Sequence, residues 1–414
     1  MTTNTPPNIV NVHTTIHPTN SLGKRSRSSR LGDDELQLIS FCVVTPPKVV
    51  GSRSIGPMIV GVLSSPDSLY SFTNQKNPSG RLGFYRLSIT HHLELMSMSP
   101  IFNSRFCMGF SSFHKILVTV DETGTCIIWS MNSKETAMIP ITTPILIADQ
   151  IPGKKMDKVT RIAFDPTNGL LAMATEKGNV MLWKVSDDKV SIGFLAIFNA
   201  HQGEITSIVF DPFNRFMATA SMDNTAILWR IDLSNRYVAI PLASLFDKYD
   251  HSLNGLRSIA LNEMDPNCVV IGDGDGTVKM WDISDTKNVR CQRTINGIKG
   301  TPSYVGFINN DGPPLLGIVN GHKINMFQVV KSTLVPVPVP KDNDPIRATF
   351  CFFNQDSNSI ITLNRDWVTY TVQIRVWKAI FSEKRPRVDQ HLVDENLVDE
   401  NPVDSPQTKR PRNE

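Results

Sequence analysis

The sequence of 414 residues lacks the signals of membrane and secreted proteins. It contains no run of about 18 apolar residues, which is the length that a membrane-spanning helix needs. Residues 1–20 do not show the basic and then apolar pattern of a secretion signal. The six cysteines form no Cys-x-x-Cys pair and no spacing typical of a disulfide framework or a zinc site, which favours a reducing compartment. We therefore expect a protein that is neither secreted nor membrane-spanning.

Motifs for cofactors, metals and catalysis are also missing. Residues 51–56 have the outer glycine spacing of a phosphate-binding loop, but Pro57 and Met58 follow where Lys and Ser or Thr are required. The acidic turn at residues 272–276 lacks the further ligands and the closing Glu of a calcium loop. The net charge of +3 is too weak to argue for nucleic acid. The sequence therefore predicts no cofactor, no metal and no enzymatic activity.

Aromatic residues recur at a nearly constant spacing along the chain. Each ends a short apolar run, and successive ones lie 46 to 54 residues apart; they are Trp129, Trp183, Trp229, Trp281, Phe327 and Trp377. A second aromatic precedes three of them by 19 residues, as Phe164 precedes Trp183 and Phe210 precedes Trp229. Such self-similarity is the signature of a repeat architecture.

Each repeat resolves into four short strands. In the clearest repeat the expected strands cover residues 205–210, 216–220, 225–231 and 238–245, which are rich in β-branched and aromatic residues. A tight turn of residues that tolerate positive φ precedes five of the aromatics. These turns contain Thr123-Gly124, Lys177-Gly178, Asp223-Asn224, Asp275-Gly276 and Asn320-Gly321. Four-stranded antiparallel units that repeat every 40 to 55 residues, roughly, predict the blades of an all-β propeller.

A seventh and weaker unit precedes the six clear ones, with strands expected at residues 36–44, 58–64, 68–72 and 82–89. The sequence therefore predicts a seven-bladed β-propeller of four-stranded antiparallel blades. We expect it to span residues 34–381, between disordered tails at residues 1–33 and 382–414.

The ring of blades must close, because open first and last blades would expose strand edges. Residues 9–16 alternate apolar and polar side chains and are one candidate for the closing strand. The other candidate is the segment 377–381, continuing into a fourth strand of the last blade. Both alternatives stay open at this point.

The repeats resemble those of the WD-repeat family. Residues 201–230 carry the landmarks of that family, which are His201 opening the blade, Asp223 six residues before the aromatic, and then Trp229. Only Trp281-Asp282 shows the literal Trp-Asp pair, so the chain resembles a divergent member. The resemblance covers about residues 35–380, and it is specific for the fold while nearly silent on activity.

The resemblance implies a structural tetrad of hydrogen-bonded side chains, formed by His201, Thr219, Asp223 and Trp229. It superficially resembles a catalytic triad, but buried polar groups need partners, and these four would satisfy one another. A partial second copy is expected from His251, Asp275 and Trp281, because position 271 holds Ile where a hydroxyl would stand.

The family resemblance also implies where partners would dock. In this family the loop before each blade and the turn before each aromatic strand line one face, and other proteins bind there. Trp367 lies outside the repeat register, in a turn that is longer than its counterparts, since Phe352 precedes Trp377 by 25 residues rather than 19 or 20. An aromatic beside an arginine on a protruding loop is typical of a binding hot spot. The alternative is that Trp367 packs into its own blade. The partner-binding candidates are Arg365, Asp366, Trp367 and Tyr370.

Short basic clusters flank an acidic repeat at residues 392–404 in the C-terminal tail. Such clusters are typical of nuclear import signals, although they also arise by accident in polar tails. The import candidates are Lys384, Arg385, Arg387, Lys409, Arg410 and Arg412. They predict residence in the nucleus rather than the cytoplasm, and they leave open whether these residues act in import or in binding.

Three functional hypotheses follow. The first is a non-enzymatic scaffold or adaptor subunit of a nuclear or nucleocytoplasmic complex that binds other proteins. The second is the substrate-recognition subunit of a ubiquitin ligase. The third is an RNA- or chromatin-associated module, whose binding would weaken with salt. The sequence names no partner and no oligomeric state, because propeller function depends on surface side chains that a common frame carries.

Overall fold

The structure, a computed structural model, shows a chain that divides into two units, Met1–Ile380 and Phe381–Glu414. All of the described residues belong to the first unit. Their backbone is described at residues 8–16, 37–44, 58–64, 79–87, 93–98, 102–103, 106–111, 114–131, 138–151, 157–188, 191–213, 216–232, 238–245, 254–296, 298, 302–308, 313–320, 323–330, 333–339, 348–354, 359–365 and 372–380. Side chains are described only between residues 107 and 339.

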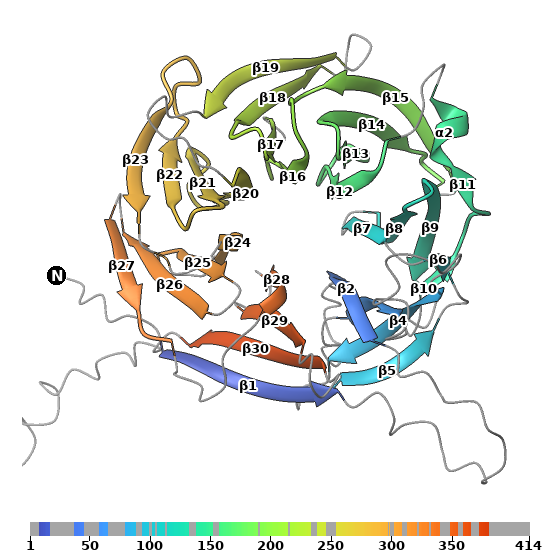
Figure 1. Ribbon diagram of the computed structural model, residues 1–414, viewed down its shortest axis with the longest axis horizontal. Helices are drawn as coiled ribbons and strands as arrows, with labels where there is room; N and C mark the ends of the chain where they lie inside the picture. Colours follow the sequence, from blue (N-terminus) through green and yellow to red (C-terminus); the bar gives the residue numbers. More distant parts are fainter. Residues whose placement is uncertain are drawn as a thin grey trace, which may run out of the picture. The chain divides into compact units, whose positions relative to one another are not determined.

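Strands of the described residues form seven antiparallel sheets, which we number as blades 1 to 7 in chain order (Figure 1). Blade 1 contains β2 (Gln37–Val44), β3 (Met58–Ser64), β4 (Ser79–Leu87) and β5 (Leu93–Met98), with β6 (Phe102–Asn103) also paired to β4. Blade 2 contains β7 (Phe106–Ser111), β8 (Ile116–Asp121), β9 (Thr125–Met131) and β10 (Met138–Pro140), with β11 (Ile145–Leu146) paired to β9 and followed by the short helix α2 (Ile147–Gln150). Blade 3 contains β12 (Val159–Phe164), β13 (Leu170–Thr175), β14 (Asn179–Val185) and β15 (Ile192–Asn199).

The remaining four blades have four strands each. Blade 4 contains β16 (Ile205–Phe210), β17 (Met217–Ser221), β18 (Ala226–Asp232) and β19 (Val238–Leu245). Blade 5 contains β20 (Leu256–Leu261), β21 (Cys268–Asp273), β22 (Val278–Asp282) and β23 (Arg290–Ile295). Blade 6 contains β24 (Pro302–Ile308), β25 (Leu315–Asn320), β26 (Lys323–Val330) and β27 (Thr333–Val337). Blade 7 contains β28 (Ala348–Asn354), β29 (Ser359–Arg365), β30 (Val372–Ile380) and, on its outside, β1 (Asn8–Ile16).

The first strand of each blade lies innermost and contacts the first strand of the next blade. This chain of contacts runs from β2 through β7, β12, β16, β20 and β24 to β28, and from β28 back to β2. Figure 1 shows the sheets arranged around one axis with these strands at the centre. The predicted all-β propeller fold is confirmed, and the strands expected in blade 4 match the observed ones to within one residue.

The two ends of the first unit meet in blade 7. β1 pairs antiparallel with β30, in a register that runs from Asn8 opposite Ile380 to Ile16 opposite Val372. The N-terminal segment therefore supplies the outer strand of the last blade, where the sequence left two candidates open. Because β1 covers the outer edge of β30, blade 7 has four strands without a further strand from the chain after Ile380.

Blade 1 differs from the expected strand assignment. Its third strand is β4 and its fourth is β5, whereas the sequence placed them at residues 68–72 and 82–89; the former segment lies outside the described residues. Tyr85 of β4 stands opposite Ile59, as Trp183 stands opposite Leu171, and in both blades a register shift precedes the aromatic on its outer side. The prediction was wrong because Tyr85 takes the position of the repeating Trp, and the third strand begins only at Ser79, after the segment expected to form it.

The core lies between the blades. Four clusters of buried apolar side chains are described, and each joins two neighbouring blades, from the pair of blades 2 and 3 to the pair of blades 5 and 6. The second strands β8, β13, β17, β21 and β25 are buried along their whole length. A blade in a ring has a neighbour against each face, so these strands do not alternate apolar and polar residues as a sheet with one wet face would.

Candidate functional site

The turns before the third strands share one local structure. Gly124, Gly178, Asn224 and Gly276 have φ between 68° and 93°, so four of the five turns expected from the sequence are confirmed; Gly321 lies outside the described residues. A short polar side chain ends the second strand and accepts hydrogen bonds from the turn backbone. Its position is held by Asp121, Thr175, Ser221, Asp273 and Asn320. These buried side chains hold the turns in place through hydrogen bonds to the backbone.

Backbone hydrogen bonds join each of these turns to the loop that enters the same blade. The N–H of Glu176 donates to the carbonyl of Lys158 in blade 3 (2.9 Å), and that of Met222 donates to the carbonyl of Glu204 in blade 4 (2.9 Å). In blade 5 the N–H of Gly274 donates to Gly255 in the same way. We call the surface formed by the entering loops (157–158, 201–204, 254–255) and the turns (176–178, 222–225, 274–277) of blades 3 to 5 the loop face.

Pairs of side chains also join the entering loop to the turn on the loop face, and the residues of the pair differ between blades 3 and 5. Lys177 forms an ion pair with Asp157 (3.3 Å) in blade 3, and Asn254 donates to the carboxylate of Asp275 in blade 5. Neighbouring blades are also joined, since the carbonyl of Gly178 accepts the N–H groups of Ala200 (2.9 Å) and His201 (3.0 Å). The loop face is therefore a hydrogen-bonded layer, and its network of backbone hydrogen bonds runs from blade 3 into blade 4.

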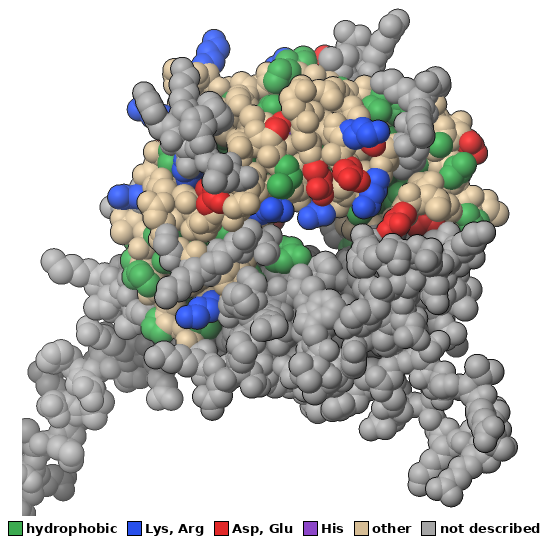
Figure 2. All heavy atoms as spheres, viewed as in Figure 1, with side chains coloured by type: hydrophobic (Ala, Val, Ile, Leu, Met, Phe, Trp, Pro, Cys, Tyr) green, Lys and Arg blue, Asp and Glu red, His purple; other side chains and the backbone are tan. Residues whose placement is uncertain are grey.

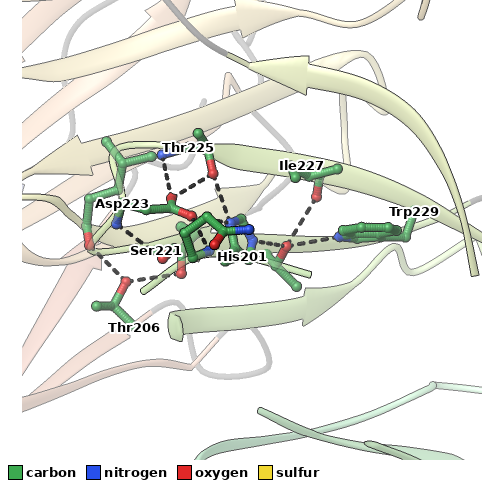
Figure 3. Close-up of polar contacts among 11 residues, drawn as sticks. His201, Thr206, Ser221, Asp223, Thr225, Ile227 and Trp229 are labelled. Carbon is green, nitrogen blue, oxygen red and sulfur yellow. Dashed lines mark hydrogen bonds and ion pairs between the residues drawn. The ribbon is translucent and has the colours of Figure 1, made fainter. Parts of the chain in front are cut away.

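The predicted tetrad lies in blade 4, and Figure 3 shows His201, Asp223 and Trp229 among its polar contacts. The Thr219 hydroxyl lies 2.7 Å from His201 Nε2 and accepts the Trp229 indole N–H at 2.9 Å. On the other side of the ring, His201 Nδ1 lies 2.7 Å from the Thr225 hydroxyl and 3.4 Å from Asp223 Oδ2. The structure thus brings together all four residues singled out in the sequence, and it adds Thr225, whose hydroxyl donates to Asp223 Oδ1 at 2.6 Å.

Asp223 connects this network to the loop. Its carboxylate accepts the backbone N–H of Gln202 (2.8 Å) and of Thr225 (2.9 Å). Partial burial raises the pKa of Asp223, but the hydrogen bonds from His201, Thr225 and the Gln202 N–H outweigh it and hold the pKa well below its ordinary value. The side chain of His201 is fully buried, and the polar atoms of its ring are satisfied within this network.

The other described blades contain only parts of this network. Trp129 donates to the Thr119 hydroxyl (2.9 Å), the counterpart of Thr219. The indole N–H groups of Trp183 and Trp281 are buried without a hydrogen-bond partner. The position that Thr219 holds in blade 4 is held by Met173 in blade 3 and by Ile271 in blade 5, and neither side chain has a hydroxyl. Met173 pairs with Met181, and Ile271 pairs with Lys279. Of the expected second copy, His251 lies outside the described residues and Asp275 binds Asn254 instead.

The low pKa of Asp223 gives a testable pH dependence. A carboxyl whose pKa is lower in the folded than in the unfolded chain stabilises the fold above its unfolded pKa, and this contribution is lost as the pH falls through the folded pKa. We expect the Tm of the wild type to exceed that of Asp223→Asn by a constant margin between pH 5 and 7. The margin should shrink below a pH of about 4. A margin that stays unchanged down to pH 3 in a thermal unfolding series would contradict this origin.

The partner-binding candidates fall mostly outside the described residues. Arg365 is the last residue of β29 and pairs with Val372, the first residue of β30, while Asp366, Trp367 and Tyr370 are not described. β29 and β30 are the second and third strands of blade 7, so the candidates belong to the connection that corresponds to the turn at 222–225 in blade 4. The import candidates at 384–387 and 409–412 also lie outside the described residues.

In the described part of the chain, no group of three or more His, Cys, Asp or Glu side chains is arranged to hold a metal ion. No helix of the described residues is long and apolar enough to cross a membrane.

Comparisons with known proteins agree with this geometry. The model of the WD domain, G-beta repeat family matches residues 193–230, which hold the tetrad. A chain of a mitotic checkpoint complex is similar in structure with a TM-score of 0.54 and 10% identity, over 89% of this chain and 99% of that one. Sqt1 from Chaetomium thermophilum is similar with a TM-score of 0.55 and 12% identity, over 74% and 76% of the two chains. No curated protein matches the sequence.

At these identities the structural similarities show the fold alone. The family match falls on the one described blade in which the full hydrogen-bonded tetrad is present. Propellers of this kind generally bind other proteins and are not enzymes. The family match to one blade, together with the repeats and the ring of sheets, supports a WD-repeat β-propeller.

Proposed function

We propose that the chain is a non-enzymatic scaffold or adaptor subunit of a nuclear or nucleocytoplasmic complex, and that it binds other proteins through its loop face. The observation that carries this proposal is the hydrogen-bonded layer of loops and turns in blades 3 to 5. A surface whose backbone is already fixed loses little conformational entropy when a partner binds. The similar chain from a mitotic checkpoint complex belongs to a multiprotein assembly, which supports a subunit role.

Exposed polar side chains project from this layer. Lys177 has 77% of its side chain exposed, and Gln202 and Asn254 are also exposed. Acidic and basic side chains lie close together on the face of the molecule shown in Figure 2. On the loop face itself, Lys177, Gln202 and Asn254 provide hydrogen-bond donors and acceptors, which is typical of the polar part of a protein interface. The nuclear part of the proposal depends on the basic clusters of the tail.

Affinity purification followed by quantitative mass spectrometry tests the proposal. A loop-face variant carries Lys158→Glu, Glu176→Lys and Gln202→Arg; the first two changes together keep the charges of an exposed pair complementary. A control variant carries Glu263→Lys and Lys287→Glu in the connections at the opposite end of the strands. We expect the amount of the main partners recovered with the loop-face variant to fall by at least about 80%, since three exposed side chains of the docking surface change their charge. The control variant should keep its partners.

Three other outcomes decide between the hypotheses. Loss of partners in the control variant alone would contradict the loop face as the docking surface. Enrichment of cullin adaptors with the wild type would favour the ubiquitin-ligase alternative. Enrichment of RNA or chromatin that disappears at moderate salt would favour the nucleic-acid alternative.

A further inference from the structure

The inner strands of blades 3, 4 and 5 are joined to one another near the loop face. Thr160 of β12 donates its hydroxyl to the carbonyl of Ile205 in β16 (2.7 Å), and Thr206 of β16 donates in the same way to Leu256 in β20 (2.7 Å). Both threonines lie at a β-bulge, the point where the strand register shifts. The starts of β12, β16 and β20 therefore lie side by side in one row.

Arg257 occupies the corresponding bulge in β20, where the register shifts between Leu256 and Ser258. A third threonine here would face the carbonyl of Pro302, which begins β24 as Ile205 begins β16. Arg257 makes no such bond, and its Nε is buried without a hydrogen-bond partner. A buried donor without a partner destabilises the fold, so the chain itself does not satisfy the guanidinium of the half-buried Arg257.

Arg161 lies in the same row, on the other side of β16. Its side chain is exposed, and one of its guanidinium nitrogens donates to the carbonyl of Thr160 (2.7 Å), which orients the group and leaves the other donors for a ligand. Neither arginine forms an ion pair with a carboxylate in the described part of the chain. Glu204, the acidic residue of the loop that enters β16, is among the carboxylates that form no ion pair with them.

We propose that Arg161 and Arg257 form a binding site for an acidic peptide segment of a protein partner, at the loop-face end of the inner strands. The planar guanidinium binds carboxylate and phosphate groups with paired hydrogen bonds, so two such groups separated by one strand can hold two acidic side chains of an extended segment. This inference rests on the proposed function, because it names the chemistry of the partner that the loop face binds.

Fluorescence anisotropy with the full-length protein tests the site. The probes are a fluorescein-labelled peptide of alternating Glu and Gly, a second with phosphoserine for Glu, and a third with Gln for Glu. We expect the wild type to bind the two charged peptides and not the Gln peptide. Arg161→Gln and Arg257→Gln should each weaken binding at least ~10-fold, because each removes a charge-assisted pair. The stronger of the two charged probes shows whether carboxylate or phosphate is the preferred source of the charge.

Arg257→Thr separates binding from folding. The hydroxyl should restore the bond to the next blade, so we expect Tm to stay level or to rise by about 2 °C while peptide binding falls as it does in Arg257→Gln. Lys287→Gln, at the opposite end of the strands, should change neither quantity. If all variants bind the Glu peptide as the wild type does, or if single-stranded RNA displaces it and binds more tightly, the inference is wrong. In that case partner loss in the loop-face variant would still support the proposed function, and partner retention would contradict it.

Discussion

Replacing Gly178 with alanine is expected to destabilise the propeller by about 3 kcal/mol or more. Gly178 has a φ of 81°, a conformation that side chains with a Cβ rarely adopt. An added Cβ would lie 2.1 Å from the carbonyl oxygen of His201, which is main chain and has no rotamer to change. The carbonyl of the same residue accepts the N–H groups of Ala200 and His201, which lead from β15 into blade 4, so relief of the clash would disturb the connection between blades 3 and 4 on the loop face.

Gly193 provides the matched control for this prediction. It lies in β15 of the same blade, and no atom lies within 4 Å of the position of an added Cβ. We expect Gly193→Ala to change the free energy of unfolding by less than about 1 kcal/mol, with a stabilising sign through the unfolded chain. Urea unfolding followed by circular dichroism measures both variants. If Gly178→Ala and Gly193→Ala lowered the free energy of unfolding equally, the contact between the turn at Gly178 and His201 would not determine stability.

Removing the hydroxyl of Thr219 should have the second-largest effect. Thr219→Val keeps the shape of the side chain but leaves His201 Nε2 and the Trp229 indole N–H without their shared partner, in a fully buried position. Each stranded polar group costs about 1–3 kcal/mol, so we expect a loss of about 2–4 kcal/mol in the free energy of unfolding.

Thr119→Val is the control for the tetrad. Its hydroxyl accepts the Trp129 indole N–H in blade 2, where the described contacts include no histidine. Urea unfolding should show a loss about half as large as for Thr219→Val, because one stranded group replaces two. A loss for Thr119→Val that equals or exceeds that of Thr219→Val would mean that His201 adds nothing to the network.

Blades 2 to 5, which have a Trp in the third strand, were predictable because two signals coincide in them. Around Trp229, for example, the tight turn at Asp223-Asn224 and the apolar strand after it both fall where the repeat expects them. Blade 1 has neither signal in its expected form. Tyr85 precedes Trp129 by 44 residues, a spacing close to that of the other repeats, but it is not a Trp and 14 residues separate its strand from the end of β3. A pattern of indoles that follow short turns therefore does not include it.

The tetrad was predictable from one blade, whereas the contacts between blades were not. His201, Thr219, Asp223 and Trp229 lie within one repeat, at separations that the family pattern fixes. The bond from Thr206 to Leu256 spans 50 residues and depends on a bulge that turns the threonine toward the next blade. A bulge changes the direction of a side chain without any clear sequence signature. For the same reason Arg161 and Arg257 do not stand out in the sequence, since only the pairing register places them in one row.

Cross-linking mass spectrometry on the wild-type protein in its native complex tests the central claim, docking through the loop face, most directly. Lys158 and Lys177 are exposed on the loop face, whereas Lys115 and Lys287 are exposed in connections at the opposite end of the strands. The account predicts that cross-links to partner proteins concentrate on Lys158 and Lys177. Cross-links to partners that concentrate on Lys115 and Lys287 instead would contradict it.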